Sequence, residues 1–120
     1  ILGGNGADTL VGGFGADTLI GGNETDRYRF VSINDTNDII TDFDSAEVLD
    51  FSAIDANTVT RGNQAFTFIG ASAFTAAGQL RMYEANGVLL VEGNTGGTID
   101  PEFQLELRQW NAATFSDILL

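Results

Sequence analysis

The fold is decided by residues 3–29, which read Gly3-Gly4-Asn5-Gly6-Ala7-Asp8-Thr9-Leu10-Val11, then Gly12-Gly13-Phe14-Gly15-Ala16-Asp17-Thr18-Leu19-Ile20, then Gly21-Gly22-Asn23-Glu24-Thr25-Asp26-Arg27-Tyr28-Arg29. In each nine-residue copy the first six positions are polar and turn-forming, whereas the eighth is large and apolar: Leu10, Leu19 and Tyr28. One nonapeptide cannot bury its apolar residue alone, so this period predicts coils that stack on one another.

The composition of each copy predicts a turn followed by a short strand. Glycine pairs allow backbone angles that other residues avoid, so a tight turn can aim several carbonyl oxygens inward, and the aspartate adds a carboxylate. Turns on one side of the stack come from alternate copies. Turn one (residues 3–8) is therefore predicted to face turn three (residues 21–26), with an oxygen cage between them for a hard cation such as calcium.

The third copy and the residues after it depart from the pattern. Glu24 replaces the fourth-position glycine, and beyond Arg29 both glycines are lost, so the roll is expected to end near residue 35. Turn two (residues 12–17) then lacks a regular partner, and Asp35, Asp38 or Asp42 either completes its site or is a solvated loop acid. The predicted calcium ligands and ligand-forming turn residues are Gly3, Gly4, Asn5, Gly6, Asp8, Gly12, Gly13, Gly15, Asp17, Gly21, Gly22, Glu24, Asp26, Asp35, Asp38 and Asp42.

Composition excludes most familiar chemistries. The 120 residues include 17 Asp and Glu but only 5 Lys and Arg, for a net charge of -12, and such a chain repels nucleic acid and anionic lipid. With no His and no Cys there is no Ser-His or Cys-His nucleophile pair, no His- or Cys-bound zinc and no disulfide. The longest aliphatic run, Val88 to Val91, is far short of the roughly 20 residues of a membrane-spanning helix, so we expect no membrane insertion.

The rest of the chain predicts strands. Asn86-Gly87 lies between residues 79–83 and 88–92 and is a strong hairpin signal, and apolar residues alternate with polar ones over residues 102–108. A short helical turn is expected over residues 71–78. The predicted fold is all-β: a short parallel β-roll over residues 1–35 runs into an antiparallel β-sandwich over residues 36–120, in one continuous unit.

The nonapeptide resembles the calcium-binding repeat of RTX proteins, which implies Ca²⁺ as the cofactor. The connector that follows, residues 38–43 and 48–55, and the aromatic run at residues 65–70 are similar to the C-terminal domain of serralysin-type proteases. A similar amino-acid sequence follows the repeats in mannuronan epimerases. The resemblance implies a secreted bacterial protein whose module folds when calcium binds outside the cell.

The two ends of the chain carry further expectations. Ile1 and Leu2 fit the last two places of a preceding copy, so the chain is expected to come from a longer protein with an upstream domain. The C-terminal residues Asp117, Ile118, Leu119 and Leu120 resemble the uncleaved signal that the type I secretion apparatus reads. A terminal strand packed on the core is the alternative interpretation of these four residues.

Two rival functions stay open at this point. A polysaccharide-binding or substrate-positioning module would need exposed aromatic and cationic side chains, for which Trp110, Tyr83, Arg81 and Arg108 are the candidates. A carboxylate-pair glycosidase is also conceivable, but the repeat aspartates are already explained as ligands. Residues 92–100 are interpreted as a loop. We therefore expect a monomeric, non-catalytic calcium module with no nucleic-acid partner.

Overall fold

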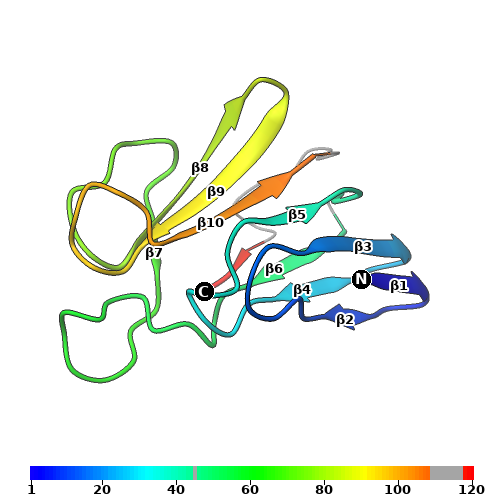
Figure 1. Ribbon diagram of the computed structural model, residues 1–120, viewed down its shortest axis with the longest axis horizontal. Coiled ribbons are helices and arrows are strands. Elements are labelled where there is room, and N and C mark those ends of the chain that lie inside the picture. The colour runs from blue at the N-terminus through cyan, green and yellow to red at the C-terminus, as the bar shows by residue number, and fades with distance from the viewer. Residues whose placement is uncertain (45, 109–117) are drawn as a thin grey trace.

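The computed structural model describes residues 1–44, 46–108 and 118–120, which form two facing β-sheets (Figure 1). The first sheet has the order β1-β3-β5-β10-β9-β8-β7, and the second has the order β11-β6-β4-β2. The all-β prediction is confirmed. The strands are β1 (Leu2–Asn5), β2 (Thr9–Leu10), β3 (Thr18–Asn23), β4 (Arg27–Arg29), β5 (Asp38–Ile40), β6 (Val48–Asp50), β7 (Thr67–Phe68), β8 (Gln79–Ala85), β9 (Val88–Asn94), β10 (Phe103–Leu107) and β11 (Ile118–Leu119).

The nonapeptide copies wind into a parallel roll, as their period predicts. Strand β1 pairs with β3 in parallel, and β2 pairs with β4 in parallel, so successive strands alternate between the two sheets. The eighth-position side chains point into the space between the sheets: Leu10 is 3% exposed, and Leu19 and Tyr28 are 0% exposed. Stacking therefore buries the residues that a single repeat would leave in water.

The parallel stack continues beyond residue 35, where the glycine pairs stop. Strand β5 pairs in parallel with β3, and β6 pairs in parallel with β4, so residues 38–50 add a further coil to the roll. The segments that connect β4 to β5 and β5 to β6 contain no glycine. Parallel pairing does not require glycine turns, since it depends on the register of the strands and on apolar residues that point inward. Residue 35 marks the end of the glycine turns and not of the roll.

The antiparallel part is joined to the roll within one sheet. The predicted hairpin forms between β8 and β9, with positive φ angles at Asn86 (55°) and Gly87 (78°). Strand β10 lies antiparallel to β9 on one side and parallel to β5 on the other, so it joins the hairpin to the coils of the roll. The antiparallel strands thus extend the first sheet of the roll.

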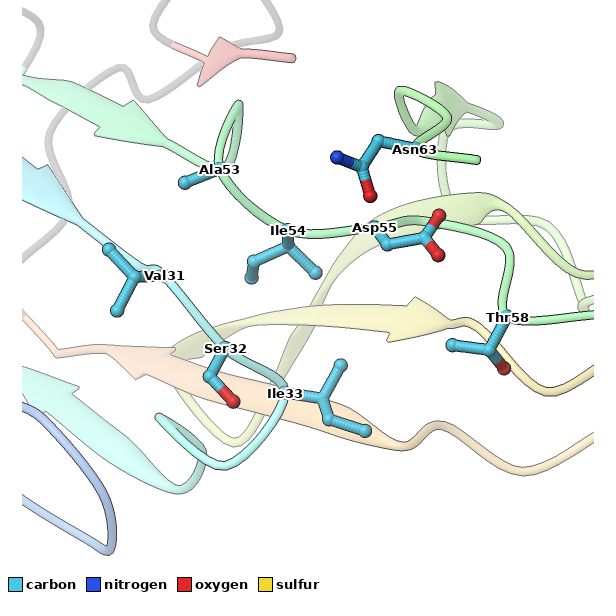
Figure 2. A pocket seen from close by; sticks show the side chains of 8 residues that line it. All are labelled: Val31, Ser32, Ile33, Ala53, Ile54, Asp55, Thr58 and Asn63. Carbon is cyan, nitrogen blue, oxygen red and sulfur yellow. The ribbon is translucent and has the colours of Figure 1, made fainter. Parts of the chain in front are cut away.

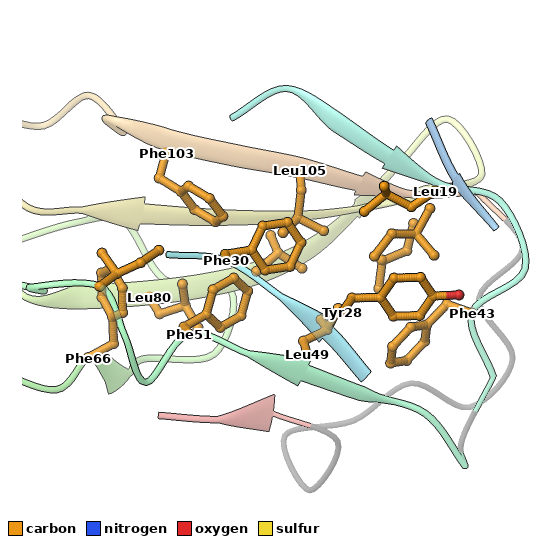
Figure 3. Packing of buried hydrophobic residues seen from close by; sticks show 14 of the residues in the cluster. Leu19, Tyr28, Phe30, Phe43, Leu49, Phe51, Phe66, Leu80, Phe103 and Leu105 are labelled. Carbon is orange, nitrogen blue, oxygen red and sulfur yellow. The ribbon is translucent and has the colours of Figure 1, made fainter. Parts of the chain in front are cut away.

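A single aromatic cluster joins the two parts between the sheets (Figure 3). The ring centroids of Phe30 and Phe51 lie 5.2 Å apart, and both rings contact Phe103 of β10, at 5.5 and 5.4 Å. Each of these side chains is at most 1% exposed. Offset and edge-to-face aromatic pairs add to the free energy gained by burial alone, so the roll and the antiparallel strands stabilise each other.

The C-terminal residues form the edge of the second sheet. Strand β11 pairs in parallel with β6, and the Phe51 amide donates to the Leu119 carbonyl at 2.9 Å. Asp117 lies outside the described residues. Ile118 and Leu119 form this terminal strand and Leu120 follows it, in the packed arrangement that was the alternative interpretation of these residues.

The predicted helical turn does not form a helix. Ala71 and residues 77–78 are in turns, residues 72–75 have no regular structure, and the amides of Thr75 and Ala76 donate to the Gln79 side chain. The expectation was wrong because this side chain satisfies the two amides and the chain enters β8 at once. Within the described ranges, no helix is long and apolar enough to cross a membrane.

Candidate metal centre

The turns share one backbone conformation. The second position of each copy has a positive φ, at Gly4 (107°), Gly13 (92°) and Gly22 (106°). The fourth position does too, at Gly6 (96°) and Gly15 (100°). Glycine adopts these angles without a steric penalty, so the sequence pattern follows from the shape of the turn.

Turn one lies directly against turn three. Gly4 is in register with Gly22, and the Asp8 amide donates to the Asp26 carboxylate at 2.9 Å. A Cβ atom on Gly3 would lie 2.5 Å from the Gly21 carbonyl oxygen and 2.9 Å from Asp8 Oδ2. The two turns therefore bring carbonyl and carboxylate oxygens close to the same point, and only glycine leaves room for this approach.

The two aspartates that meet here each have one buried carboxylate oxygen without a donor. These oxygens are Asp8 Oδ2 and Asp26 Oδ2, and the Asp26 residue is 1% exposed. A cavity of about 230 Å³ at this contact is lined by Ala7, Asp8, Thr9, Thr25, Asp26, Arg27 and Val48. A buried anionic oxygen without a donor is costly, and a bound cation removes that cost.

Turn two lies against residues 34–38. The Asp17 amide donates to Asp38 Oδ1 at 2.8 Å, and the Gly15 amide donates to the Asn34 carbonyl at 3.0 Å. A Cβ atom on Gly12 would lie 3.0 Å from both Asp17 Oδ2 and Asp38 Oδ2, so these carboxylates converge. Of the three acids that could complete this site, Asp38 is the one whose carboxylate meets that of Asp17.

The second contact also contains oxygens without donors. Asp38 Oδ2 and Asp35 Oδ1 are buried and unpaired, while Asp35 Oδ2 accepts the amides of Val31 and Ser32. Burial raises the pKa of the Asp38 carboxyl, the Asp17 amide lowers it, and the negative charges of Asp17 and Asp35 raise it further. A cation would oppose the effects that raise this pKa.

Asp42 lies in a different environment. Its Oδ1 accepts the Gly21 amide at 3.1 Å and the Tyr28 hydroxyl at 2.9 Å, and its Oδ2 accepts the Gly22 amide at 2.9 Å. Asp42 therefore joins turn three and not turn two. Both of its carboxylate oxygens have protein donors, which distinguishes it from Asp8, Asp26, Asp35 and Asp38.

The donor set fits calcium. Within the described part of the chain, no three acidic side chains form a ready metal cluster, so a cation would be held by two carboxylates at each contact together with backbone carbonyl oxygens. Calcium accepts such mixed oxygen ligands in flexible geometry, whereas magnesium demands a near-ideal octahedron. The buried oxygens without donors and the close approach allowed by Gly3 and Gly12 are what such a site requires.

Glu24 adopts the turn conformation at a cost. Its φ is 78°, in the region that its counterparts Gly6 and Gly15 reach freely, and the residue is exposed. We expect Glu24→Gly to stabilise the calcium-bound protein by about 1 kcal/mol, because an L-residue pays about that much for a left-handed conformation. Thermal unfolding in saturating calcium measures this.

Glu24→Ala is the matched control, because it removes the carboxylate but keeps the Cβ atom. It is expected to leave the unfolding temperature close to that of the parent chain. If both variants instead weaken calcium binding equally, the Glu24 carboxylate is a ligand and the interpretation of backbone strain fails.

The larger described cavity, about 300 Å³, lies where the chain leaves β4 and β6 (Figure 2). It is lined by Val31, Ser32, Ile33, Ala53, Ile54, Asp55, Thr58 and Asn63. Its one carboxylate, Asp55, uses Oδ1 to accept the amides of Asn57 and Gln64. The lining has one carboxylate beside the neutral polar side chains of Ser32, Thr58 and Asn63, and it includes no residue of the three glycine turns, so this cavity is separate from the stacked turns.

Of the candidate glycan-binding residues, Arg81, Arg108 and Tyr83 are engaged in contacts within the protein. Arg81 forms an ion pair of 2.7 Å with Glu92 and lies over the rings of Phe74 and Tyr83. Arg108 pairs with Glu106 at 3.2 Å, and Trp110 lies outside the described residues. The arrangement of Arg81 does not present a free cation to an acidic polysaccharide.

The loop after β9 is closed by side chains. Glu102 Oε2 accepts the Thr95 amide at 2.9 Å, and the Asn94 side chain accepts the Gly97 amide at 3.0 Å. The interpretation of residues 92–100 as a loop holds for residues 95–100, since the first three residues belong to β9.

The sequence analysis did not identify Glu47, which lies beside Tyr28 and among the acids Asp26, Asp42 and Asp44. This residue is 2% exposed and faces the Tyr28 hydroxyl. One feature of the sequence could have indicated such a residue: the third copy has Tyr28 where the other two copies have leucine. A tyrosine hydroxyl at the end of an apolar core needs a polar partner.

Comparisons with known proteins agree with this geometry. Residues 1–29 match the model of the RTX calcium-binding nonapeptide repeat (4 copies). The whole fold is similar to the solution structure of the AlgE6R3 subunit of a mannuronan C5-epimerase from Azotobacter vinelandii, with a TM-score of 0.59 and 24% identity over 98% of this chain. The chain spans 65% of the length of that structure. No curated protein gives a significant match. Residues 1–29 are thus similar to RTX calcium-binding repeats, and they are set in an all-β fold similar to that of the epimerase subunit.

Proposed function

We propose that this chain is a non-catalytic calcium-binding module that folds when calcium binds, after a larger bacterial protein has left the cell. The observation that carries the proposal is the set of buried carboxylate oxygens without donors, on Asp8, Asp26, Asp35 and Asp38. In the absence of a cation these groups oppose folding, because each loses hydration and gains no partner. Calcium would supply the missing partner.

Location would then control folding. Extracellular modules bind calcium at about 0.1 to 1 mM, above the free concentration in a bacterial cytoplasm. One site at a free calcium concentration of 100 times Kd adds about 2.7 kcal/mol, a large share of the stability of a small domain. The chain would stay unfolded inside the cell, in the form that a narrow export channel can pass.

The proposal assigns the C-terminal residues to the export signal. Asp117, Ile118, Leu119 and Leu120 would be read by the type I secretion apparatus while the chain is unfolded. The pairing of β11 with β6 supports this order of events, because the strand is part of the sheet only once β6 has formed. The upstream part of the same polypeptide is the proposed partner, and the module acts as a monomer.

Calcium titration of an Asp26→Asn variant tests the proposal. Asparagine keeps an oxygen for the Asp8 amide but removes the negative charge from the contact between turns one and three, so the affinity of that site should fall about tenfold or more. Isothermal titration calorimetry measures the affinity and the number of ions.

Asp100→Asn is the control, since Asp100 is exposed in the loop after β9 and its substitution changes the net charge equally. Its calcium affinity should equal that of the parent chain. A parent chain that binds no calcium, or equal losses in the two variants, would show that the stacked turns are not the binding site.

A further inference from the structure

The larger cavity, of about 300 Å³, has an apolar end and a polar end. In Figure 2 the side chains of Val31, Ile33 and Ile54 lie at the left and centre of the cavity, whereas those of Asp55 and Thr58 lie at the right. Ile54 is buried, and Ile33 packs against the hydrophobic core. A cavity of this kind fits a ligand with a short apolar part and a polar head group.

The carboxylate of Asp55 has one oxygen that the protein does not use. Its Oδ1 accepts the amides of Asn57 and Gln64, both at 3.2 Å. Among the described residues Oδ2 has no donor, and Asp55 takes part in none of the ion pairs. The charge of this half-buried carboxylate is therefore unbalanced, in a chain whose net charge is -12. This electrostatic field attracts a cationic ligand and repels an anionic one.

The loop that carries the polar groups is fixed at both ends. Residues 55–64 are closed at their base, where the Ala56 amide donates to the Gln64 carbonyl at 2.9 Å. On the other side, the amide and the hydroxyl of Thr58 both donate to the Thr95 carbonyl at 3.0 Å. These contacts hold the polar end in place without a ligand, which lowers the entropic cost of binding one.

The polar end offers oxygen acceptors that match an ammonium group. Asp55 Oδ2 is the charged acceptor. The Thr58 hydroxyl gives its proton to the Thr95 carbonyl, so its oxygen can only accept from a ligand. The exposed Asn63 side chain, which also lines the cavity, adds an amide oxygen. An alkylammonium has three donors and no acceptor, so it can use all three oxygens.

Other head groups fit this end less well. A guanidinium binds most strongly when it takes both oxygens of a carboxylate, but Oδ1 of Asp55 already accepts two amides. A phosphate or a uronic acid would meet the negative charge of Asp55. The described lining has no aromatic side chain, which the glycan-binding interpretation requires. An ammonium on an aliphatic chain is therefore the ligand class that both ends of the cavity favour.

We propose that this cavity binds a primary alkylammonium group, with the aliphatic chain against Ile33 and Ile54 and the ammonium at Asp55 Oδ2. This inference goes beyond the proposed calcium function, since no residue of the three glycine turns lines the cavity. The sequence contains no lysine, so the group comes from a free amine or from a lysine outside this sequence.

Titration with n-butylammonium in saturating calcium, followed by heteronuclear NMR of the backbone amides, tests the cavity. The amides of Ser32, Asp55 and Thr58 are expected to shift, and n-butanol, which has the same chain without the charge, should bind about tenfold more weakly or less. Asp55→Asn keeps an Oδ1 acceptor for the two amides and removes the charge, so it should weaken binding about tenfold or more.

Asp100→Asn is the matched control, because it changes the net charge equally at an exposed position in the loop after β9. Its affinity for n-butylammonium should equal that of the parent chain. Equal losses in the two variants would show general attraction of cations to an acidic chain and would overturn the inference. A tenfold increase in free calcium at constant ionic strength should leave the affinity unchanged, and competition would overturn the inference by placing calcium at Asp55.

Asn63→Asp covers the case in which Asp55→Asn folds poorly, since Asn63 is exposed. A second carboxylate at the polar end should tighten binding of n-butylammonium about threefold or more, and an unchanged affinity would overturn the inference. Two further probes separate the sources of the group. Tighter binding of Nα-acetyl-lysine methylamide than of cadaverine would indicate a lysine side chain, and the reverse order a free diamine. Failure of all three amines to shift the cavity amides would overturn the inference.

Discussion

Removal of calcium by EGTA is expected to unfold the whole chain. The turns hold buried carboxylate oxygens without donors, and the net charge of -12 adds repulsion throughout the chain. Two sites at 100 times Kd would together supply about 5 kcal/mol, comparable with the total stability of a small domain. The antiparallel strands would unfold with the roll, because Phe103 of β10 packs on Phe30 and Phe51.

Far-ultraviolet circular dichroism during a calcium titration measures this effect. The β-sheet signal should appear cooperatively with calcium and stay absent with magnesium, whose octahedral geometry the turns do not provide. A chain that keeps its full signal and a cooperative thermal transition in EGTA would show that the core stabilises the fold without metal, and the conditional folding mechanism would then be wrong.

Gly22→Ala is expected to cause the largest loss of stability of any single methyl addition in the turns. The backbone of Gly22 has a φ of 106°, and an added Cβ atom would collide with the Gly4 carbonyl oxygen of turn one. Strained backbone costs about 1–3 kcal/mol and overpacking a similar amount, so the combined loss should be about 3 kcal/mol or more. The collision also pushes turn one away from turn three, so calcium affinity should fall.

Gly13→Ala separates the two causes. Gly13 holds the same position in turn two with a φ of 92°, but a Cβ atom there would meet no atom within 4 Å. This variant should show only the backbone cost, measured by chemical or thermal unfolding in saturating calcium. Equal losses in Gly22→Ala and Gly13→Ala would mean that the close approach of turns one and three contributes nothing.

Local sequence was enough to predict the elements whose pattern is contained in a short stretch of the chain. The nine-residue period predicted the parallel coils, because each copy contains its own turn glycines and its own inward residue. The Asn86-Gly87 pair predicted the hairpin, since its strands are adjacent in sequence and its turn type demands positive φ angles. Alternation predicted β10, whose Phe103, Leu105 and Leu107 are all fully buried.

The acids beyond the repeats could be grouped from sequence but not assigned to partners. Sequence left Asp35, Asp38 and Asp42 as equal candidates for turn two. The structure brings Asp38 to Asp17 and Asp42 to turn three, across separations of 21 and 20 to 21 residues. These pairings depend on the register of β5 against β3, and once the glycine pattern stops no local feature of the chain sets that register.

The coil, the turn shape and the chemistry of the ligands follow from the amino-acid sequence alone, because glycine geometry and carboxylate charge are properties of each residue in its own repeat. Only the tertiary structure decided where the stack ends and which acids need a cation. The roll continues through β5 and β6 without glycine turns, and β10 joins it through parallel pairing with β5. Whether a carboxylate such as that of Asp42 has donors or lacks them depends on residues brought beside it by strands far apart in the chain, and this determines its role.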